Sequence, residues 1–308
     1  MRHMTTMAAG METQPAVTDP QWIRKFFTMD IVHKPGTAFY YNSAACSMVG
    51  ACIRKLTGLG LREYLRPRLF DIIGIDADHL KWHCHPDGME NGSGGLVSST
   101  EDNARMMELY RRGGVWNGTQ VLAPEWVSFA LQTQNDHLDP PVSYGGMMWK
   151  RSECLMADGA MGQWAMLFPQ KDTIVSLSET ISSGEQGDAV MNAVFDFVRS
   201  LPDSAPPEDA QATAALKARL GRLAMPAPDY AENPQLLQRL HRTRYRLTQG
   251  SVHFFADDLT IFNPDYAVAI HGFGFEAVDG NLLLTVEAGS WQVHCPVGLK
   301  GQRLVSTI

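Results

Sequence analysis

The stretch from Pro35 to Gly58 reads PGTAFYYNSAACSMVGACIRKLTG, and the rest of the chain is best understood outward from it. A Pro-Gly turn leads into an aromatic run, and Asn42 and Ser43 then precede an amphipathic segment. Apolar residues of that segment recur at three- and four-residue steps, and Gly58 suits a left-handed cap, which predicts a helix between them. The pattern places the hydroxyl of Tyr41 and two small polar side chains at the start of a helix.

Helical patterns and strand patterns occupy separate parts of residues 1–201. Apolar periodicity predicts helices at 20–30, 43–57, 61–70 (interrupted at Pro67), 103–112, 124–132 and 187–201. Short β-branched or aromatic runs predict antiparallel strands at 144–150, 163–168 and 173–178. Ser99 and Asp102 have the spacing of a capping box at the start of the fourth helix. Because helices and strands are segregated rather than alternating, we predict an α+β fold.

The second part of the chain differs in composition. Residues 202–214, PDSAPPEDAQATA, are rich in proline, alanine and acidic residues, as linkers often are. A charged helix and several strand-like runs follow, among them one at 259–263. We therefore predict a first domain over 1–201, a linker over 202–214, and a helix plus a small all-β domain over 215–308.

Charge and composition exclude several function classes. A net charge of −7 and a pI near 5.8 argue against a nucleic-acid partner, because phosphate binding needs a basic surface. The sequence has no run of 18 apolar residues, so we expect no membrane span. An odd count of 5 cysteines does not suggest a disulfide framework, and residues 1–15 lack the apolar core of a signal peptide. We therefore expect a cytoplasmic location and no cofactor or metal; the sequence does not indicate the oligomeric state.

The 35–58 stretch resembles the second active-site motif of the β-lactamase-related serine hydrolases, P-G-T-x-F-x-Y-[SN]-[NS] followed by a helix ending in T-G. Five more segments resemble family segments in the same order: RHMTTMAAGM (2–11), LREYLRPRLFDIIGI (61–75), SGGLVSSTEDNARM (93–106), GGVWNGTQVLAPEWV (113–127) and ADGAMGQWAMLFPQKD (157–172). On this ordered set the chain is identified as a member of that family, which includes class C β-lactamases and penicillin-binding-protein-like esterases.

The resemblance implies a helical region packed on an antiparallel sheet, with an acyl-transfer cleft between them. In the family a serine attacks an ester or amide carbonyl and forms an acyl-enzyme, a lysine and a tyrosine move its proton, and water releases the acyl group. Carried onto this chain, the resemblance makes Tyr41 the proton-transfer tyrosine. The residues expected to line the substrate site are Asn42, Ser43, Gly94, Gly95, Asp158, Gly159, Ala160, Gly162 and Gln163.

The chain departs from the family pattern in three ways. The S-x-x-K motif, which supplies the nucleophilic serine and its lysine, occurs nowhere in the 308 residues. The tyrosine motif reads Y-N-S rather than Y-x-N, so the amide and hydroxyl positions are exchanged. The third motif has Asp158-Gly159 where penicillin-recognising relatives have Lys-Thr-Gly or His-x-Gly, and a carboxylate there would repel the carboxylate of a β-lactam. We therefore expect a small neutral or cationic ester or amide as substrate.

Two explanations of the missing motif remain open. Either the chain is an N-terminally truncated serine hydrolase of the esterase or peptidase type, inactive as it stands, or it is a pseudoenzyme that keeps the cleft as a binding module. Ser43 and Ser47 have no lysine three residues on, so neither replaces the S-x-x-K serine.

Two residue-level alternatives also remain. A tyrosine has a reference pKa of about 10 and acts as a base only beside cations, so Tyr41 judged on its motif alone would be a core residue. His79, His83 and His85 could hold a metal in a metal-dependent hydrolase, although the Pro-Asp-Gly that follows favours a surface loop.

Overall fold

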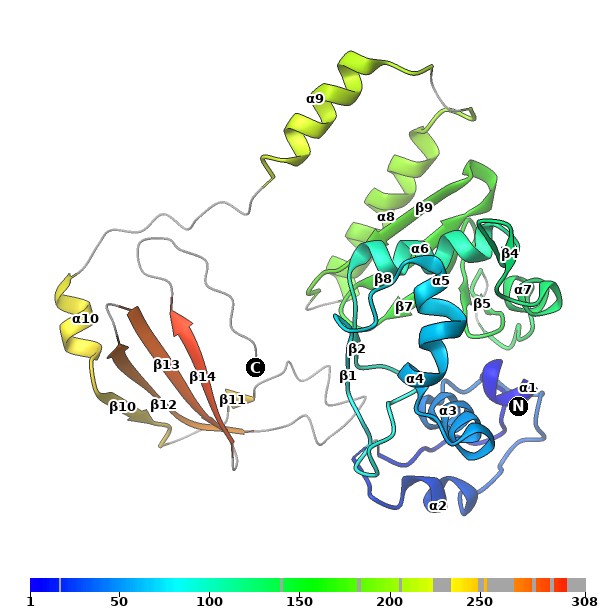
Figure 1. The fold of residues 1–308 in the computed structure, drawn as a ribbon. Coiled ribbons are helices and arrows are strands. Elements are labelled where there is room, and N and C mark those ends of the chain that lie inside the picture. The colour runs from blue at the N-terminus through cyan, green and yellow to red at the C-terminus, as the bar shows by residue number, and fades with distance from the viewer. Residues whose placement is uncertain are drawn as a thin grey trace. The chain divides into compact units, whose positions relative to one another are not determined.

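The computed structural model describes residues 1–16, 18–138, 141–181, 184–204, 207–223, 234–248, 252–253, 269–278, 281–288 and 291–297. The chain divides into two compact units, Met1–Asp203 and Ser204–Ile308 (Figure 1). Each unit is described by itself. Among the helices of the described ranges, none combines the length and the apolar character needed to cross a bilayer.

The first unit begins with helices. They are α1 (Arg2–Thr5), α2 (Trp22–Phe27), α3 (Ser43–Thr57), α4 (Leu61–Leu65), the π-helical turn η1 (Arg66–Phe70), α5 (Asp71–Ile73), α6 (Thr100–Arg111) and α7 (Pro124–Leu131). Two short antiparallel hairpins, β1 (Lys81–Trp82) with β2 (Leu96–Val97) and β3 (Val115–Trp116) with β4 (Thr119–Gln120), lie between them. The interruption expected at Pro67 is present, because α4 gives way there to the π-helical turn.

Helix α3 is fixed at both ends by its own sequence. Asn42 is the N-cap, and its side chain accepts a hydrogen bond from the backbone N–H of Ala45. Gly58 ends the helix with φ 76°, as the sequence predicts. Apolar periodicity predicts a buried face of Ala45, Met48, Val49, Cys52, Ile53 and Leu56. Ala45 and Met48 are buried as predicted, whereas Leu56 is 84% exposed and Ser47 and Gly50 are buried instead. Met48 packs with the aromatic residues of α2, which covers α3.

The sheet of the first unit is antiparallel, in the order β5 (Ser143–Tyr144), β6 (Trp149–Lys150), β7 (Leu155–Gly159), β8 (Gln163–Phe168), β9 (Thr173–Leu177). The stretch 144–150, predicted as a single strand, is instead a tight hairpin, because Met147 at φ 63° turns the chain between β5 and β6. Strand β7 was not predicted. The hairpin and β7 together bring the third family motif into the middle of the sheet.

Helices cover both faces of this sheet (Figure 1). Along β8 the side chains alternate, with Trp164, Met166 and Phe168 in one hydrophobic cluster and Ala165 and Leu167 in another. The first cluster is completed by Met191, Phe195 and Val198 of α8 (Gly184–Ser200), and the second by Met107 of α6. Apolar periodicity predicts an inward face of Ala189, Val190, Ala193, Val194 and Phe197; Val190 and Val194 do pack against the first cluster, whereas Phe197 is 60% exposed.

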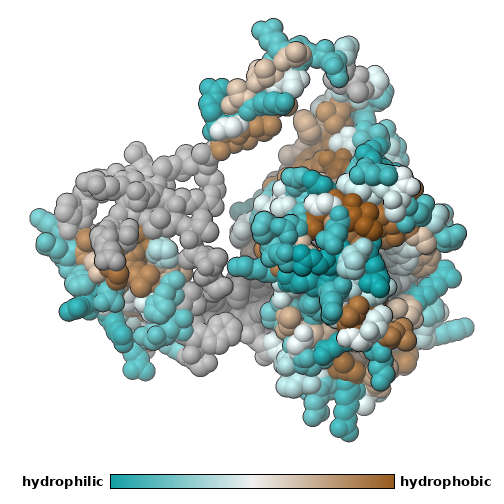
Figure 2. Space-filling view, in the orientation of Figure 1, coloured by the Kyte–Doolittle hydropathy of each residue, from teal (hydrophilic) through white to brown (hydrophobic). Residues whose placement is uncertain are grey.

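The second unit contains α9 (Ala210–Leu220), α10 (Pro234–Leu240) and an antiparallel sheet of β10 (Thr243–Arg246), β12 (Ala269–Val278), β13 (Asn281–Ala288) and β14 (Trp291–Val297), with β11 (Val252–His253) paired to β12. Helix α9 begins inside the stretch predicted as a linker and buries none of its residues. Figure 2 shows its apolar residues beside hydrophilic ones. Tyr245 of β10 stacks on Phe273 of β12, with ring centroids 5.1 Å apart. The strand predicted at 259–263 lies outside the described residues.

Candidate active site

Tyr41 lies in the loop that enters α3, with its ring held between aromatic neighbours. The backbone N–H of Tyr40 donates to the carbonyl oxygen of Met7 at 2.9 Å, which ties this loop to the segment after α1. The Tyr41 ring stacks on Trp149 of β6, with centroids 5.5 Å apart and planes 13° apart, and meets Tyr144 edge-on at 6.4 Å. Tyr41 therefore joins the helical region to the sheet.

The electrostatic surroundings of Tyr41 favour its protonated form. The pKa of Tyr41 is raised to about 12, chiefly by burial and to a smaller extent by the Cys46 thiol and the Asp158 carboxylate. Within the described residues, no lysine or arginine contributes in the opposite direction. At neutral pH Tyr41 is a hydrogen-bond donor, and it lacks the cation that would let it act as a base.

The two polar residues after Tyr41 have different environments. Asn42 is 1% exposed; besides capping α3, it donates from Nδ2 to the carbonyl oxygen of Thr13 at 3.3 Å. Its polar atoms are thus used inside the protein, so a substrate contact by Asn42 remains a prediction that this geometry does not favour. Ser43 is half-buried, and its hydroxyl makes no hydrogen bond within the described part of the chain. Of the pair, Ser43 is the one free to meet a ligand.

The third motif is a β-hairpin whose glycines are required by close packing. A Cβ on Gly159 would lie 2.9 Å from the Cβ of Gln163, and one on Gly162 would lie 2.6 Å from Cδ1 of Ile181. Gly162 also has φ 88°, a region that side chains other than glycine rarely adopt. Ala160 lies exposed in the turn between β7 and β8. The hairpin is therefore rigid where the resemblance expects the cleft wall.

Asp158 on β7 is a paired carboxylate. Oδ2 accepts from Nη2 of Arg151 at 3.0 Å, and Oδ1 accepts from Nε1 of Trp164 at 2.8 Å. The Asp158 side chain is 23% exposed and that of Arg151 is 33% exposed. The sequence predicts that Asp158 repels a substrate carboxylate, and this prediction assumes that Asp158 has no counter-ion. The guanidinium of Arg151 reduces that repulsion.

Gln163 and the glycine loop are held by contacts of their own. Gln163 donates from Nε2 to the carbonyl oxygen of Glu179 and accepts from the Ser178 hydroxyl at 2.6 Å. Gly94 and Gly95 are exposed, and the carbonyl oxygen of Gly95 accepts from the backbone N–H of His83 at 2.9 Å. The structure brings Tyr41 and Asp158 into one electrostatic neighbourhood, while Gly94 and Gly95 make no described contact with either of them.

Comparisons with known proteins identify the family of the chain. The family model described as Beta-lactamase matches residues 1–194. The chain belongs to the β-lactamase family. Among curated proteins, none matches the chain.

Solved structures share the β-lactamase fold at low identity. The octameric penicillin-binding protein homologue from Pyrococcus abyssi is 14% identical with a TM-score of 0.50, over 96% of this chain and 68% of that one. A β-lactamase candidate from Bacteroides dorei is 14% identical with a TM-score of 0.52, over 65% of this chain and 72% of that one. A 6-aminohexanoate-dimer hydrolase candidate from Bacillus anthracis is 20% identical with a TM-score of 0.49, over 64% of this chain and 54% of that one. The present chain thus spans only about half the length of that relative.

In this β-lactamase-family chain, Ser47 and Lys150 do not replace the serine and lysine of S-x-x-K. Ser47 is 0% exposed and donates its hydroxyl to Oδ1 of Asn91 at 2.8 Å, so it cannot meet a substrate. Lys150 follows Trp149 on β6 and donates to the Thr133 hydroxyl at 3.1 Å. Its ammonium is therefore engaged away from the Tyr41 ring, because successive strand residues point to opposite faces.

Sequence reasoning missed the aromatic and charged residues that surround the two motifs. Trp149, Tyr144, Arg151 and Trp164 all contact a predicted site residue. Three of them lie within 144–151, YGGMMWKR, and the aromatic residues at the ends of that turn were the available signal. Their partners are distant in sequence, so only the strand pairing shows the contacts.

The histidines of the β-lactamase-family chain do not converge. His79 Nδ1 lies 3.4 Å from Oδ2 of Asp76, whereas the His85 ring stacks on Trp22 with centroids 4.2 Å apart. Among the described residues, no group of three His, Cys, Asp or Glu side chains is arranged to hold a metal ion. The metal-dependent alternative thus gains no support from the geometry.

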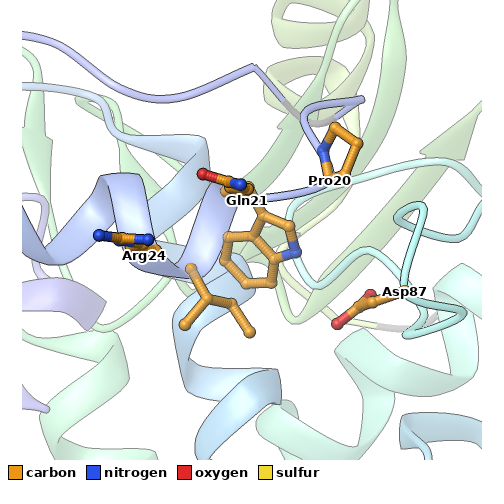
Figure 3. Close-up of a pocket in the computed structure, with 6 residues that line it drawn as sticks. Pro20, Gln21, Arg24 and Asp87 are labelled. Atoms are coloured by element: carbon orange, nitrogen blue, oxygen red, sulfur yellow. The ribbon is translucent and has the colours of Figure 1, made fainter.

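Two surface hollows of the first unit lie apart from Tyr41. One, of about 390 Å³, is lined by residues 20–24 and Asp87; Figure 3 shows Gln21 at the start of helix α2, Arg24 on this helix, and Asp87 across the hollow. The other, of about 580 Å³, is lined by Arg2, Gln134 and residues of α7 with its C-cap. Neither contains a residue of the second or third motif.

Proposed function

We propose that this chain carries the tyrosine and third-motif side of an acyl-transfer site, and that the complete enzyme is a serine hydrolase acting on a neutral or cationic ester or amide. The observation that carries the proposal is the geometry that links Tyr41 and Asp158: the Tyr41 ring stacks on Trp149 of β6, and β6 pairs with β7, which carries Asp158. Tyr41 and Asp158 come from two motifs far apart in the sequence, and the Asp158 charge acts on the Tyr41 phenol. Membership of the β-lactamase family supports the same reaction class.

The proposed reaction has two steps. A serine oxygen adds to the substrate carbonyl, its proton passes to a lysine–tyrosine pair, and the bond to the leaving group breaks as that group takes up a proton. Water then adds to the acyl-enzyme and releases the acid. Tyr41 is protonated at neutral pH, so it can be the group that donates the proton to the leaving group. It would serve as a base only if a lysine ammonium lowered its pKa.

The serine and lysine are proposed to come from a segment outside these 308 residues. Support comes from the sequence, which has no S-x-x-K, and from Tyr41, whose surroundings lack the cation the chemistry needs. Substrate charge is inferred from Asp158. Arg151 beside it weakens this negative charge without cancelling it at Tyr41, because Asp158 still raises the pKa of the Tyr41 phenol, so an anionic substrate is disfavoured relative to a neutral or cationic one. One fold relative, EstCE1, is named a hydrolase with promiscuous acyltransferase activity.

The test begins with the DNA upstream of the Met1 codon in the same frame. We expect an open frame that encodes S-x-x-K, and we expect the extended protein to hydrolyse neutral and cationic p-nitrophenyl esters faster than a matched anionic one. Tyr41→Phe in the extended protein should lower kcat by roughly 10²-fold on a neutral alkyl ester, whose alkoxide leaving group must take up a proton, since the substitution removes the proton donor. Preference for the anionic ester would contradict the substrate assignment, and an unchanged kcat would contradict the role of Tyr41.

A second candidate function is a pseudoenzyme that binds a ligand in the same site. It is favoured by the pKa of about 12 at Tyr41, which leaves the phenol inert as a base, and by the buried Ser47. A nearby in-frame stop codon upstream of Met1 would support this candidate and contradict the hydrolase.

A further inference from the structure

Trp149 is held firmly by contacts that do not involve Tyr41. Strand β6 pairs on one side with β5, placing Trp149 opposite Tyr144, and on the other with β7, placing it opposite Met156. The turn before it is fixed as well, because the backbone N–H of Met147 donates to the carbonyl oxygen of Thr5 at 2.8 Å. A Cβ on Gly145 would lie 2.1 Å from the carbonyl oxygen of Ala130, so this turn is also packed closely against the end of α7.

The indole ring is held in orientation by two further rings. Tyr144 meets it edge-on, with centroids 5.1 Å and planes 85° apart, and Phe39 lies tilted against it at 5.7 Å and 56°. Tyr41 stacks on the same indole with planes 13° apart. A large flat surface that is itself fixed restricts the ring parallel to it, because rotation of that ring would create overlap with the indole.

The other neighbours of Tyr41 do not define its ring plane in this way. The titratable and charged groups that act on it are Cys46 of α3, Tyr144 of β5 and Asp158 of β7. Tyr144 touches the ring by an edge, and among these groups no cation faces the phenol. Trp149 alone, of the described aromatic contacts, lies parallel to Tyr41.

We infer that Trp149 is a positioning residue, which fixes the plane of the Tyr41 ring and so the direction in which its hydroxyl points. The value of this role rests on the proposed function, in which that hydroxyl meets the leaving group. A proton donor contributes to catalysis only when it is aimed at the reacting atom, so an oriented ring is a requirement of that chemistry.

The inference is tested on the chain as it exists, with tyrosine labelled by ¹³C in the ring. In the wild-type protein we expect a high ¹³C order parameter at the ε positions of Tyr41, because a slow 180° flip leaves the ring plane and the hydroxyl oxygen unchanged and only changes of the plane itself are restricted. In Trp149→Leu we expect this order parameter to fall, and in Trp149→Phe, which keeps a flat surface, we expect it to stay high. A low order parameter in the wild-type protein would overturn the inference without any variant having to fold.

A titration adds a second readout. If Trp149→Leu lets water reach the phenol and lowers the pKa of Tyr41 by about one unit, roughly half of Tyr41 is ionised at pH 11, against roughly a tenth in the wild-type protein. Trp116→Leu removes another half-buried indole and is the matched control, and Tyr110, which belongs to a different cluster, is the internal reference. An equal change at Tyr41 in Trp116→Leu would mean that Trp149 only adds stability. These two experiments measure no catalysis, so their outcome does not depend on whether the extended protein is a hydrolase.

Discussion

Arg151 Nη2 lies 3.0 Å from Asp158 Oδ2, so the carboxylate of the third motif has its counter-ion in the neighbouring strand turn. Trp164 Nε1 occupies the other carboxylate oxygen at 2.8 Å. The sequence suggests an unpaired charge facing the substrate, whereas the structure has a compensated one. This difference changes what each substitution at the site should do.

Arg151→Gln should destabilise the first unit by about 1–3 kcal/mol, because a partly buried carboxylate then keeps only the indole donor. Urea unfolding followed by tryptophan fluorescence measures the change. The matched control is Asp78→Asn, which breaks the solvent-exposed ion pair between Arg66 and Asp78 and should change the free energy of unfolding little. Equal effects of the two substitutions would contradict a special role for the Arg151–Asp158 pair.

Asn42→Ala should lower stability by about 1–2 kcal/mol, because the N-cap bond to Ala45 and the bond to Thr13 are both lost. Asn42→Ser retains a capping oxygen and should recover part of the loss. The loss of stability in Asn42→Ala and its partial recovery in Asn42→Ser should both be seen by thermal unfolding of the ligand-free protein. A stable Asn42→Ala variant that fails only in ligand binding would restore the substrate contact expected from the motif.

Stability should fall at alkaline pH. The pKa of Tyr41 is raised by burial from 10.0 to about 12, so the folded state keeps a proton that the unfolded chain has already lost. The stabilisation from this group is complete below pH 10 and disappears as the pH rises to about 12. Between pH 10 and about 12, the free energy of unfolding should fall more steeply in the wild-type protein than in Tyr41→Phe, by up to about 1.4 kcal/mol per pH unit. Urea unfolding at a series of pH values measures both slopes. An identical slope in the variant would contradict the buried phenol.

The acid side should depend on Glu108. Hydrogen bonds from Arg111, and then from Arg112, lower the pKa of Glu108 from 4.5 to about 2. Its contribution is therefore present above pH 4.5 and lost as the pH falls towards 2. Glu108→Gln should cost about 1 kcal/mol at pH 7 and flatten the acid limb of the stability curve, whereas Glu101→Gln, at a 73% exposed side chain, should change little. No difference between the two variants would contradict the paired state of Glu108.

Local signals in the sequence predicted well. The helix from Ser43 to its glycine cap and the capping box of Ser99 and Asp102 are present in the structure, because each depends on residues a few positions apart. The ordered motifs identified the family, which the match over residues 1–194 confirms. The positions of the domain boundaries remain predictions.

Features that depend on tertiary pairing could not be predicted in this way. The 144–150 hairpin was missed because Met147 adopts φ 63°, a conformation that its side chain does not indicate. The buried face of α8 depends on which sheet face it meets, so periodicity placed Val190 and Val194 against the sheet but wrongly placed Phe197 there as well. The stacking of Trp149 on Tyr41 and the pairing of Arg151 with Asp158 depend on strand register, and they complete the candidate site.

The most direct measurement is labelling of the purified 308-residue chain with a fluorophosphonate probe, followed by mass-spectrometric mapping of any modified serine. We predict no specific labelling, because the described Ser47 is buried and hydrogen-bonded and no S-x-x-K exists in the sequence. Stoichiometric labelling of Ser43 or any other serine of this chain would show that it has its own nucleophile, and would contradict the proposal that the nucleophile lies outside these residues.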